Sequence, residues 1–357
     1  MIDIANEIEN IIGNDESNTL EYKAVLPPSK SIAKLICSFA NTEGGYLLLG
    51  ISDNKEINGL SEDFRANSIT HKAIDLLSPK PNIHYQYVMH EGKKLYAIKI
   101  EKSEVPILLE GSVLIRTGTK TQLEVPHEIT FSPGGYVRIS EISNLLIDYS
   151  LNGTNSKIKL VGHYQSVLKL IDDLGTILYP NSVETPTNNQ EGKILTRILF
   201  SSYVDSFEAY LSDLLYEIFL ANPDSLKSQQ KVTIEEVLNC SDMQDFVEYW
   251  SKQKISKLQK GSVKGFIKDN KQIKDLNIIN ETEELEIERI LQIRHLYAHR
   301  NGIVDEKFLQ YFTGEFASNS EHQICIKEFC DKLVYLIEII EKIDNSAKDK
   351  YNLASDN

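Results

Sequence analysis

The residues with the clearest chemical potential stand near the C-terminal end of the chain, at Arg294 and His299. Arginine can stabilise the negative charge that builds up on a reacting phosphate. Histidine has a pKa near neutrality and can act as a general acid or base. RNA supplies its own nucleophile, the 2′-hydroxyl, so such a pair could cleave a phosphodiester without a metal ion. Both residue types also favour the dipole at a helix C-terminus, and spacing alone favours this structural interpretation.

Helices must position this pair. The chain from about residue 194 onward is predicted to be helical, with amphipathic helices at 194–219, 283–297 and 326–343. Asn301-Gly302 predicts the end of the helix that carries the pair. Five residues separate Arg294 from His299, which is more than one helical turn. We therefore expect the two side chains to meet only if the helix loosens at its C-terminal end.

The segment from Arg294 to His299 resembles the signature of HEPN ribonucleases, in which an arginine and a polar residue precede a histidine. An upstream run, Phe207-Glu208-Ala209-Tyr210-Leu211, resembles the first helix of HEPN domains. The resemblance covers about 194–345 and implies an all-α HEPN bundle that cleaves RNA with Arg294, His295 and His299 and needs no cofactor. HEPN domains usually dimerise, so the resemblance also implies a homodimer in which two copies of the motif share one cleft.

Three further residues near this motif are expected to be structural. Glu208 or Asp213 could orient the catalytic arginine, but a solvated charge on the helix surface is the favoured interpretation of each. Tyr297 is expected to pack in the core rather than to take part in chemistry.

The N-terminal third is predicted to mix strands with helices. Strand patterns occur at 20–24, 46–51, 94–100 and 113–116, and a helical pattern occurs at 31–40. The continuous apolar run at 46–51 predicts a central strand that is buried on both faces. Asn41 and Gly44-Gly45 form a corner between helix and strand, and we expect the Asn41 side chain to bond to the loop backbone. These elements predict an α+β domain.

The run from Phe39 to Gly59 closely resembles the Schlafen AlbA-type domain, and Val113–Thr119 resembles a later strand of that family. The match covers about 1–130 and implies a mixed sheet with helices that binds DNA or RNA. In Schlafen-type nucleases, carboxylates form a tRNA-cleaving site, and by motif position these are Glu16, Glu21 and Asp53. Such a site implies Mg²⁺ or Mn²⁺. Phosphate contacts are then expected from Lys23, Arg116 and Lys120.

A structural alternative stands beside this interpretation of the carboxylates. The two glutamates could stabilise the fold through partners such as Lys23. Asp53 lies in Ser-Asp-Asn-Lys, an ordinary turn sequence. Nucleic-acid binding by this domain is therefore favoured over catalysis.

Composition is typical of a globular protein with two or three domains: 357 residues, 41% hydrophobic and 25% charged. The net charge of −14 argues against broad, unspecific affinity for nucleic acid. Residues 1–140 hold 14 Lys and Arg against 18 Asp and Glu, a net of −4, so this part is the better candidate for a nucleic-acid surface. Four cysteines without zinc spacing predict reduced thiols and a cytoplasmic protein. We expect neither a signal peptide nor a membrane span.

The expected organisation is a nucleic-acid-binding domain at 1–135, a linker with a connecting helix at 136–193, a HEPN domain at 194–345 and a polar tail at 346–357. Three functions are compatible with these features. The first is a metal-independent endoribonuclease with a Schlafen-type recognition domain, acting in antiphage defence or as a toxin-like effector. The second is a metal-dependent tRNA nuclease at the N-terminal carboxylates, with a helical domain that only dimerises. The third is a non-catalytic regulator that binds DNA or RNA.

Overall fold

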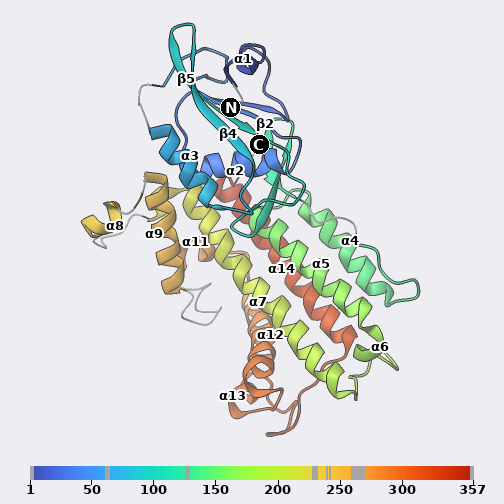
Figure 1. Cartoon of the computed structure of the whole chain (residues 1–357). Coiled ribbons are helices and arrows are strands. Elements are labelled where there is room, and N and C mark those ends of the chain that lie inside the picture. The colour runs from blue at the N-terminus through green and yellow to red at the C-terminus, as the bar shows by residue number, and fades with distance from the viewer. Residues whose placement is uncertain are drawn as a thin grey trace. The chain divides into compact units, whose positions relative to one another are not determined.

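The computed structural model describes residues 4–353, apart from 61–64, 125–128, 227–231, 239, 241–242 and 259–269. The chain divides into two compact units (Figure 1). Unit 1 comprises Met1–Glu124 and Val232–Phe246, and unit 2 comprises Val125–Lys231 and Val247–Ser355.

Unit 1 is an α/β domain with two four-stranded sheets. In the first sheet the strand order is β1-β2-β5-β4, where β1 and β2 are parallel and the other pairs are antiparallel. The second sheet has the order β3-β6-β7-β8. The mixed sheet with helices that the sequence predicted is confirmed. The elements are α1 (Ile4–Ile8), β1 (Leu20–Lys23), α2 (Ser29–Ala40), β2 (Gly45–Leu49), α3 (Arg65–Asp75), β3 (Leu77–Ser78), β4 (Ile83–His90), β5 (Lys93–Ile100), β6 (Leu108–Leu109), β7 (Ser112–Thr117), β8 (Lys120–Leu123) and α8 (Ile234–Leu238).

Strand β2 lies between β1 and β5 and is apolar on both faces. Leu47 and Leu49 are fully buried in one core cluster, together with α2. Leu48 is fully buried in a second cluster on the opposite face, together with α1 and β1. The predicted central strand, buried on both sides, is confirmed.

The corner after α2 joins the two sheets. The Asn41 side-chain amide donates to the carbonyl oxygens of Ile107, at 2.8 Å, and Leu114, at 3.0 Å. Its Oδ1 accepts the Ile107 N–H at 2.7 Å. At Gly44 the φ angle is +76°, and an added Cβ would lie 2.7 Å from the Ile100 carbonyl oxygen, so glycine is required there. Asn41 is architectural as predicted, but it bonds to the neighbouring segments rather than to its own loop.

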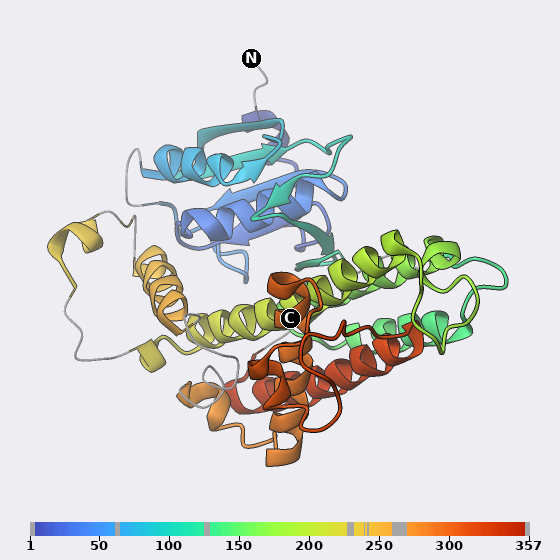
Figure 2. The ribbon, with the colours of Figure 1, turned by 90° about the horizontal axis from the view of Figure 1, so that it is seen from below.

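Unit 2 is a bundle of long helices (Figure 2). Helix α7 is the longest and packs against α5, α12 and α14. Its apolar stripe, which includes Phe200, Tyr203 and Phe207, is buried in the core of the unit. The elements are α4 (Val137–Ser150), α5 (Asn155–Asp173), α6 (Gly175–Leu178), α7 (Gln190–Ala221), η1 (Pro223–Leu226), α9 (Met243–Leu258), α11 (Lys271–Lys274), α12 (Glu281–Arg300), α13 (Glu306–Leu309) and α14 (Ile326–Tyr351).

The domain boundaries differ from the predicted ones in two places. The connecting helix expected within 136–193 is present as α5, but the segment is not a linker, because α4, α5 and α6 bury apolar side chains in the core of unit 2. The predicted polar tail at 346–357 is also too long. Helix α14 continues to Tyr351, and both Ala347 and Leu353 are buried. In both places isolated apolar residues find partners in the bundle that the local sequence does not reveal.

None of the four cysteines, all of which the structure describes, forms a disulfide. Burial raises the pKa of the Cys330 thiol to about 12, so this residue is an inert part of the core. Across the described residues, no helix combines the length and apolarity that a membrane crossing requires.

Candidate functional site

Helix α12 holds Arg294 in contact with a carboxylate of α7. The Nε and Nη2 atoms of Arg294 both lie 2.5 Å from Oδ1 of Asp205. Its Nη2 also lies 3.9 Å from Oε2 of Glu208. The Arg294 side chain is 26% exposed, so the guanidinium remains accessible from solvent. An oriented, accessible arginine of this kind can bind a phosphate.

Asp205 was not among the predicted residues; Glu208 and Asp213 were the carboxylates considered as partners that could orient the arginine. Asp213 pairs with Lys159 at 3.0 Å on the surface, which agrees with its interpretation as a solvated charge. Burial raises the pKa of the Glu208 carboxyl, while Arg294 opposes that shift. Asp205 and Glu208 are three residues apart and therefore share a face of α7.

The two histidines of the motif lie beside each other. His295 and His299 are one helical turn apart, and their ring centroids are 4.8 Å apart. His299 is exposed and His295 is half-buried. Burial, and then the nearby Lys307 and His299, lower the pKa of His295. The pair therefore presents adjacent imidazoles at the C-terminal end of α12.

The expected loosening of α12 is not observed. The helix is regular through Arg300, and Asn301 ends it in the left-handed conformation with φ of 49°. At 3.6 residues per turn, five residues place Arg294 and His299 about 140° apart around the helix axis. Arg294 contacts α7, whereas His299 packs beside His295. The prediction that Asn301-Gly302 ends the helix is confirmed.

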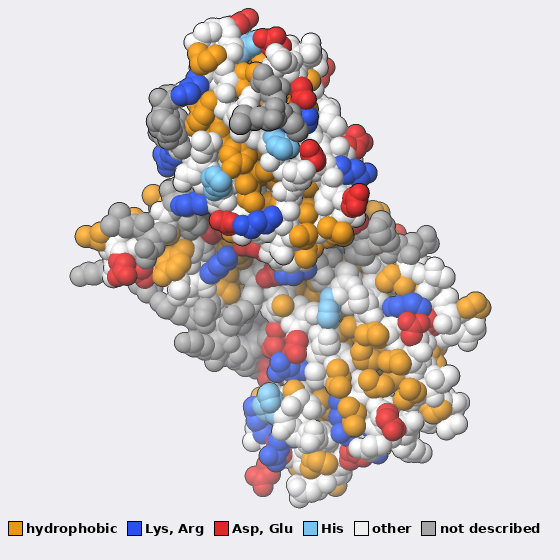
Figure 3. Space-filling model, viewed as in Figure 1, with side chains coloured by type: hydrophobic (Ala, Val, Ile, Leu, Met, Phe, Trp, Pro, Cys, Tyr) orange, Lys and Arg blue, Asp and Glu red, His pale blue; other side chains and the backbone are white. Residues whose placement is uncertain are grey.

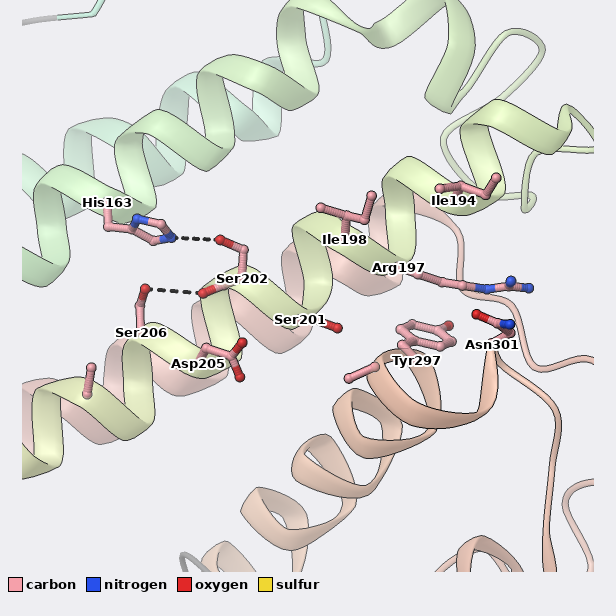
Figure 4. Close-up of a pocket in the computed structure, with 12 residues that line it drawn as sticks. His163, Ile194, Arg197, Ile198, Ser201, Ser202, Asp205, Ser206, Tyr297 and Asn301 are labelled. Carbon is pink, nitrogen blue, oxygen red and sulfur yellow. Dashed lines mark hydrogen bonds between the residues drawn. The ribbon is translucent and has the colours of Figure 1, made fainter. Parts of the chain in front are cut away.

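A groove of about 690 Å³ runs along the exposed face of α7 (Figure 4). Asp205 lines this groove, which therefore reaches the carboxylate that holds Arg294. Polar groups in it include His163, whose Nε2 lies 3.0 Å from Ser202 Oγ. Tyr297 also lines it but is only 5% exposed, and its hydroxyl bonds to His322, so its predicted place in the core is confirmed.

The same groove has an apolar part. Ile194 and Ile198 of α7 line it and are 46% and 57% exposed. On the face shown in Figure 3, apolar side chains gather over this region of unit 2, in the lower right of the view. Exposed apolar surface of this kind marks a face that can bind a partner.

The candidate residues of unit 1 are largely engaged in a buried ion-pair cluster. The Arg116 side chain is fully buried, and its Nη2 lies 2.5 Å from Glu21 Oε2. Its Nε donates to the Ser17 carbonyl oxygen at 2.7 Å, and its guanidinium stacks over Phe39 at 4.5 Å. Lys23 Nζ lies 2.6 Å from the other Glu21 oxygen. Arg116 therefore cannot reach a phosphate in this structure, contrary to its predicted role, because it supports the fold.

The three carboxylates do not form a metal site in this structure. Glu21 is neutralised by Arg116 and Lys23, and Glu16 accepts the Tyr22 N–H at 2.8 Å. Asp53 is exposed in a turn. Among the described residues, which include all three, no group of three or more His, Cys, Asp or Glu side chains is arranged to hold a metal ion. The donor set does not fit the divalent cation that the resemblance implied.

Lys23 and Lys120 retain surface positions in unit 1. The Lys23 side chain is 36% exposed despite its ion pair, and Lys120 is exposed at the start of β8. Of the three predicted phosphate contacts, these two remain accessible to a nucleic acid.

Comparison with known proteins finds a family match for most of the N-terminal part of unit 1. The Schlafen, AlbA_2 family model matches residues 16–124, which supports a Schlafen AlbA_2 domain in this part of the chain. A domain of this family suggests a function related to nucleic acids. No curated protein matches the chain.

Two solved structures are similar to parts of the chain. The DIP2311 protein from Corynebacterium diphtheriae is 14% identical, with a TM-score of 0.27; the match covers 40% of this chain and spans 38% of that protein. The N-terminal domain of a RecG-related protein from Nitrosomonas europaea is 20% identical, also with a TM-score of 0.27; the match covers 38% of this chain and 99% of that domain.

Proposed function

We propose that unit 2 is a metal-independent endoribonuclease of the HEPN type and that unit 1 recognises nucleic acid. The observation that carries the proposal is the C-terminal end of α12. There an accessible guanidinium, held by Asp205, and two adjacent imidazoles stand within two helical turns. Arginine and histidine can supply the charge stabilisation and the proton transfer for phosphodiester cleavage without a metal.

In the proposed reaction the RNA 2′-oxygen attacks phosphorus and the bond to the 5′-oxygen breaks. The products are a 2′,3′-cyclic phosphate and a 5′-hydroxyl. His299 accepts the proton of the 2′-hydroxyl, and the imidazolium that forms returns this proton to the leaving 5′-oxygen. Arg294 stabilises the charge on the phosphoryl oxygens. His295 lies against His299 and assists it in this scheme.

A homodimer is part of the proposal. Arg294 and His299 point to different sides of a regular helix, so a single copy does not bring them together on one phosphate. A second copy would supply the complementary residue across a shared cleft. The exposed Ile194 and Ile198 in the groove of α7 support a protein contact on this unit.

The second candidate, a metal-dependent tRNA nuclease in unit 1, is disfavoured by the pairing of Glu21 with Arg116 and Lys23. The AlbA_2 match supports a binding role for unit 1 instead. We propose that this domain directs the nuclease to RNA, with tRNA among the substrates, and that the activity serves antiphage defence or a toxin-like arrest of translation.

The test is cleavage of total tRNA and mRNA by the full chain, with and without EDTA, followed by mapping of the ends. Wild type should give 2′,3′-cyclic phosphate ends in EDTA, and Arg294→Ala and His299→Ala should lose the activity while circular dichroism shows folded protein. Arg289→Ala is a matched control, because Arg289 lies on the same helix, is 28% exposed and pairs with Glu315. Equal cleavage by wild type and both motif variants would reject the proposal.

A further inference from the structure

His295 and His299 together present a feature that the cleavage scheme does not use in full. They occupy positions i and i+4 of α12, on one face of a regular helix, with ring centroids 4.8 Å apart. His299 is exposed and His295 is half-buried, so a small ion can approach both rings from solvent. Two histidines at this spacing on one helical face form the metal-binding pair of the H-E-x-x-H motif.

We propose that His295 and His299 form a two-histidine binding site for a divalent transition metal such as Zn²⁺, and that the bound ion inhibits the nuclease. Zn²⁺ binds imidazole nitrogen at about 2.0–2.1 Å, which places two nitrogen ligands of a tetrahedral ion about 3.4 Å apart. Histidines four residues apart on a helix bind one ion in the H-E-x-x-H motif, and the rings of His295 and His299 already lie side by side, with centroids 4.8 Å apart. The helix backbone need not move.

The neighbouring charges limit the strength of this site. Lys307 is a nearby cation, and Asp305, the nearby anion, lies 3.4 Å from Arg300. No group of three or more metal-ligating side chains occurs in the described part of the chain, so water completes the coordination. A pair of nitrogen ligands selects Zn²⁺, Ni²⁺ or Cu²⁺ over Mg²⁺ and Ca²⁺, which prefer oxygen.

The bound metal would inhibit RNA cleavage because it would occupy the imidazole nitrogens that transfer protons. This part of the inference rests on the proposed function. An imidazole nitrogen that coordinates Zn²⁺ can neither accept nor donate a proton. The metal is therefore a competitor for His299 rather than a cofactor. Chelation by EDTA should restore the activity of a Zn²⁺-treated sample, not remove it.

The experiment is a Zn²⁺ titration of the full chain, in competition with a fluorescent chelator. His295→Ala and His299→Ala should each lose one equivalent of binding or weaken it at least about tenfold, since even the loss of an outer-shell partner costs about 10–100-fold in metal affinity. The matched control is His163→Ala, which removes a histidine that bonds to Ser202 elsewhere in unit 2. Mg²⁺ should not compete. Unchanged Zn²⁺ binding in both motif variants would overturn the site.

Cleavage assays on the same samples separate the two proposals. Zn²⁺ binding that depends on His295 and His299, without RNA cleavage by wild type, would support the site and reject the nuclease. RNA cleavage without such binding would reject the site alone. Inhibition by Zn²⁺ that remains equally strong in His295→Ala, measured against that variant's own activity, would place the inhibitory ion elsewhere and overturn the inference.

Discussion

Replacing Glu21 with glutamine should destabilise unit 1 strongly, because it leaves the Arg116 charge buried without its counterion. The Arg116 side chain is fully buried and that of Glu21 is 8% exposed. Breaking a buried ion pair by removing one partner costs about 3–5 kcal/mol. Arg116 keeps its bonds to the carbonyl oxygens of Ser17 and Leu20, so we expect the lower end, about 3 kcal/mol.

Hydrogen exchange measured by mass spectrometry can detect this loss within the full chain. At about 1.4 kcal/mol per tenfold, 3 kcal/mol corresponds to roughly 100-fold faster exchange of the most protected amides in β1 and β2. The fluorescence of Trp250, the single tryptophan, reports separately on the unfolding of unit 2. The matched control is Lys23→Gln, which removes the more exposed partner of Glu21 and should cost at most about 1 kcal/mol.

The opposite outcome would refute this reasoning. If Glu21→Gln exchanged like wild type but lost a cleavage activity that requires Mg²⁺ or Mn²⁺, Glu21 would be a site residue rather than part of the scaffold. If Lys23→Gln lost as much protection from hydrogen exchange as Glu21→Gln, the exposed pair of Lys23 with Glu21, and not the buried pair of Arg116 with Glu21, would stabilise this corner of unit 1.

Three other predictions concern unit 2. Burial lowers the pKa of His322 to about 4, below the ordinary 6.5, so the unfolded chain binds the proton first and stability should fall by up to about 3 kcal/mol from pH 6.5 to pH 4. In urea titrations at several pH values, His322→Phe should make the free energy of unfolding less dependent on pH. The same pH dependence in the variant as in wild type would contradict this prediction. Asp205→Asn should change stability by less than about 1 kcal/mol but lower RNA cleavage, because Arg294 loses the carboxylate that orients it; unchanged cleavage would contradict a positioning role. Ile198→Glu, at a side chain that is 57% exposed, should preserve the fold but weaken the proposed homodimer in light scattering, and an unchanged mass would exclude this face as the contact.

Much of unit 1 was predictable because its signals are local. The continuous apolar run at 46–51 predicted β2. Asn41 and Gly44-Gly45 predicted the corner, because the backbone there requires glycine. The role of Arg116 was not predictable, since its burial depends on carbonyl oxygens of Ser17 and Leu20, about 100 residues earlier in the chain. A strand that ends in arginine looks the same in sequence whether the side chain faces solvent or the core.

In unit 2 the helices were predictable and their partners were not. Periodicity gave α7, α12 and α14 to within a few residues at most ends, apart from the C-terminus of α14. Periodicity also indicates the helix α5, but the polar stretches on either side of it resemble linkers, so its place in the core of unit 2 was not predicted. Asp205 was missed for a related reason. Its partner Arg294 lies 89 residues away, and only the packing of α7 against α12 brings them together.

The two arginines differ in the exposure of their ion pairs, and this difference distinguishes a scaffold residue from a candidate site residue. Arg116 and Arg294 both meet a carboxylate at 2.5 Å, but the first side chain is fully buried and the second is 26% exposed. A buried guanidinium cannot exchange its carboxylate for a phosphate without exposing an uncompensated charge, at a cost of several kcal/mol. An exposed pair is worth about 1 kcal/mol or less, so a phosphodiester can displace or share it cheaply. The segment from Arg294 to His299, whose sequence signature is the less specific, therefore supplies the better candidate for catalysis. The N-terminal domain has the stronger family match, but its charges at Glu21 and Arg116 are largely committed to folding.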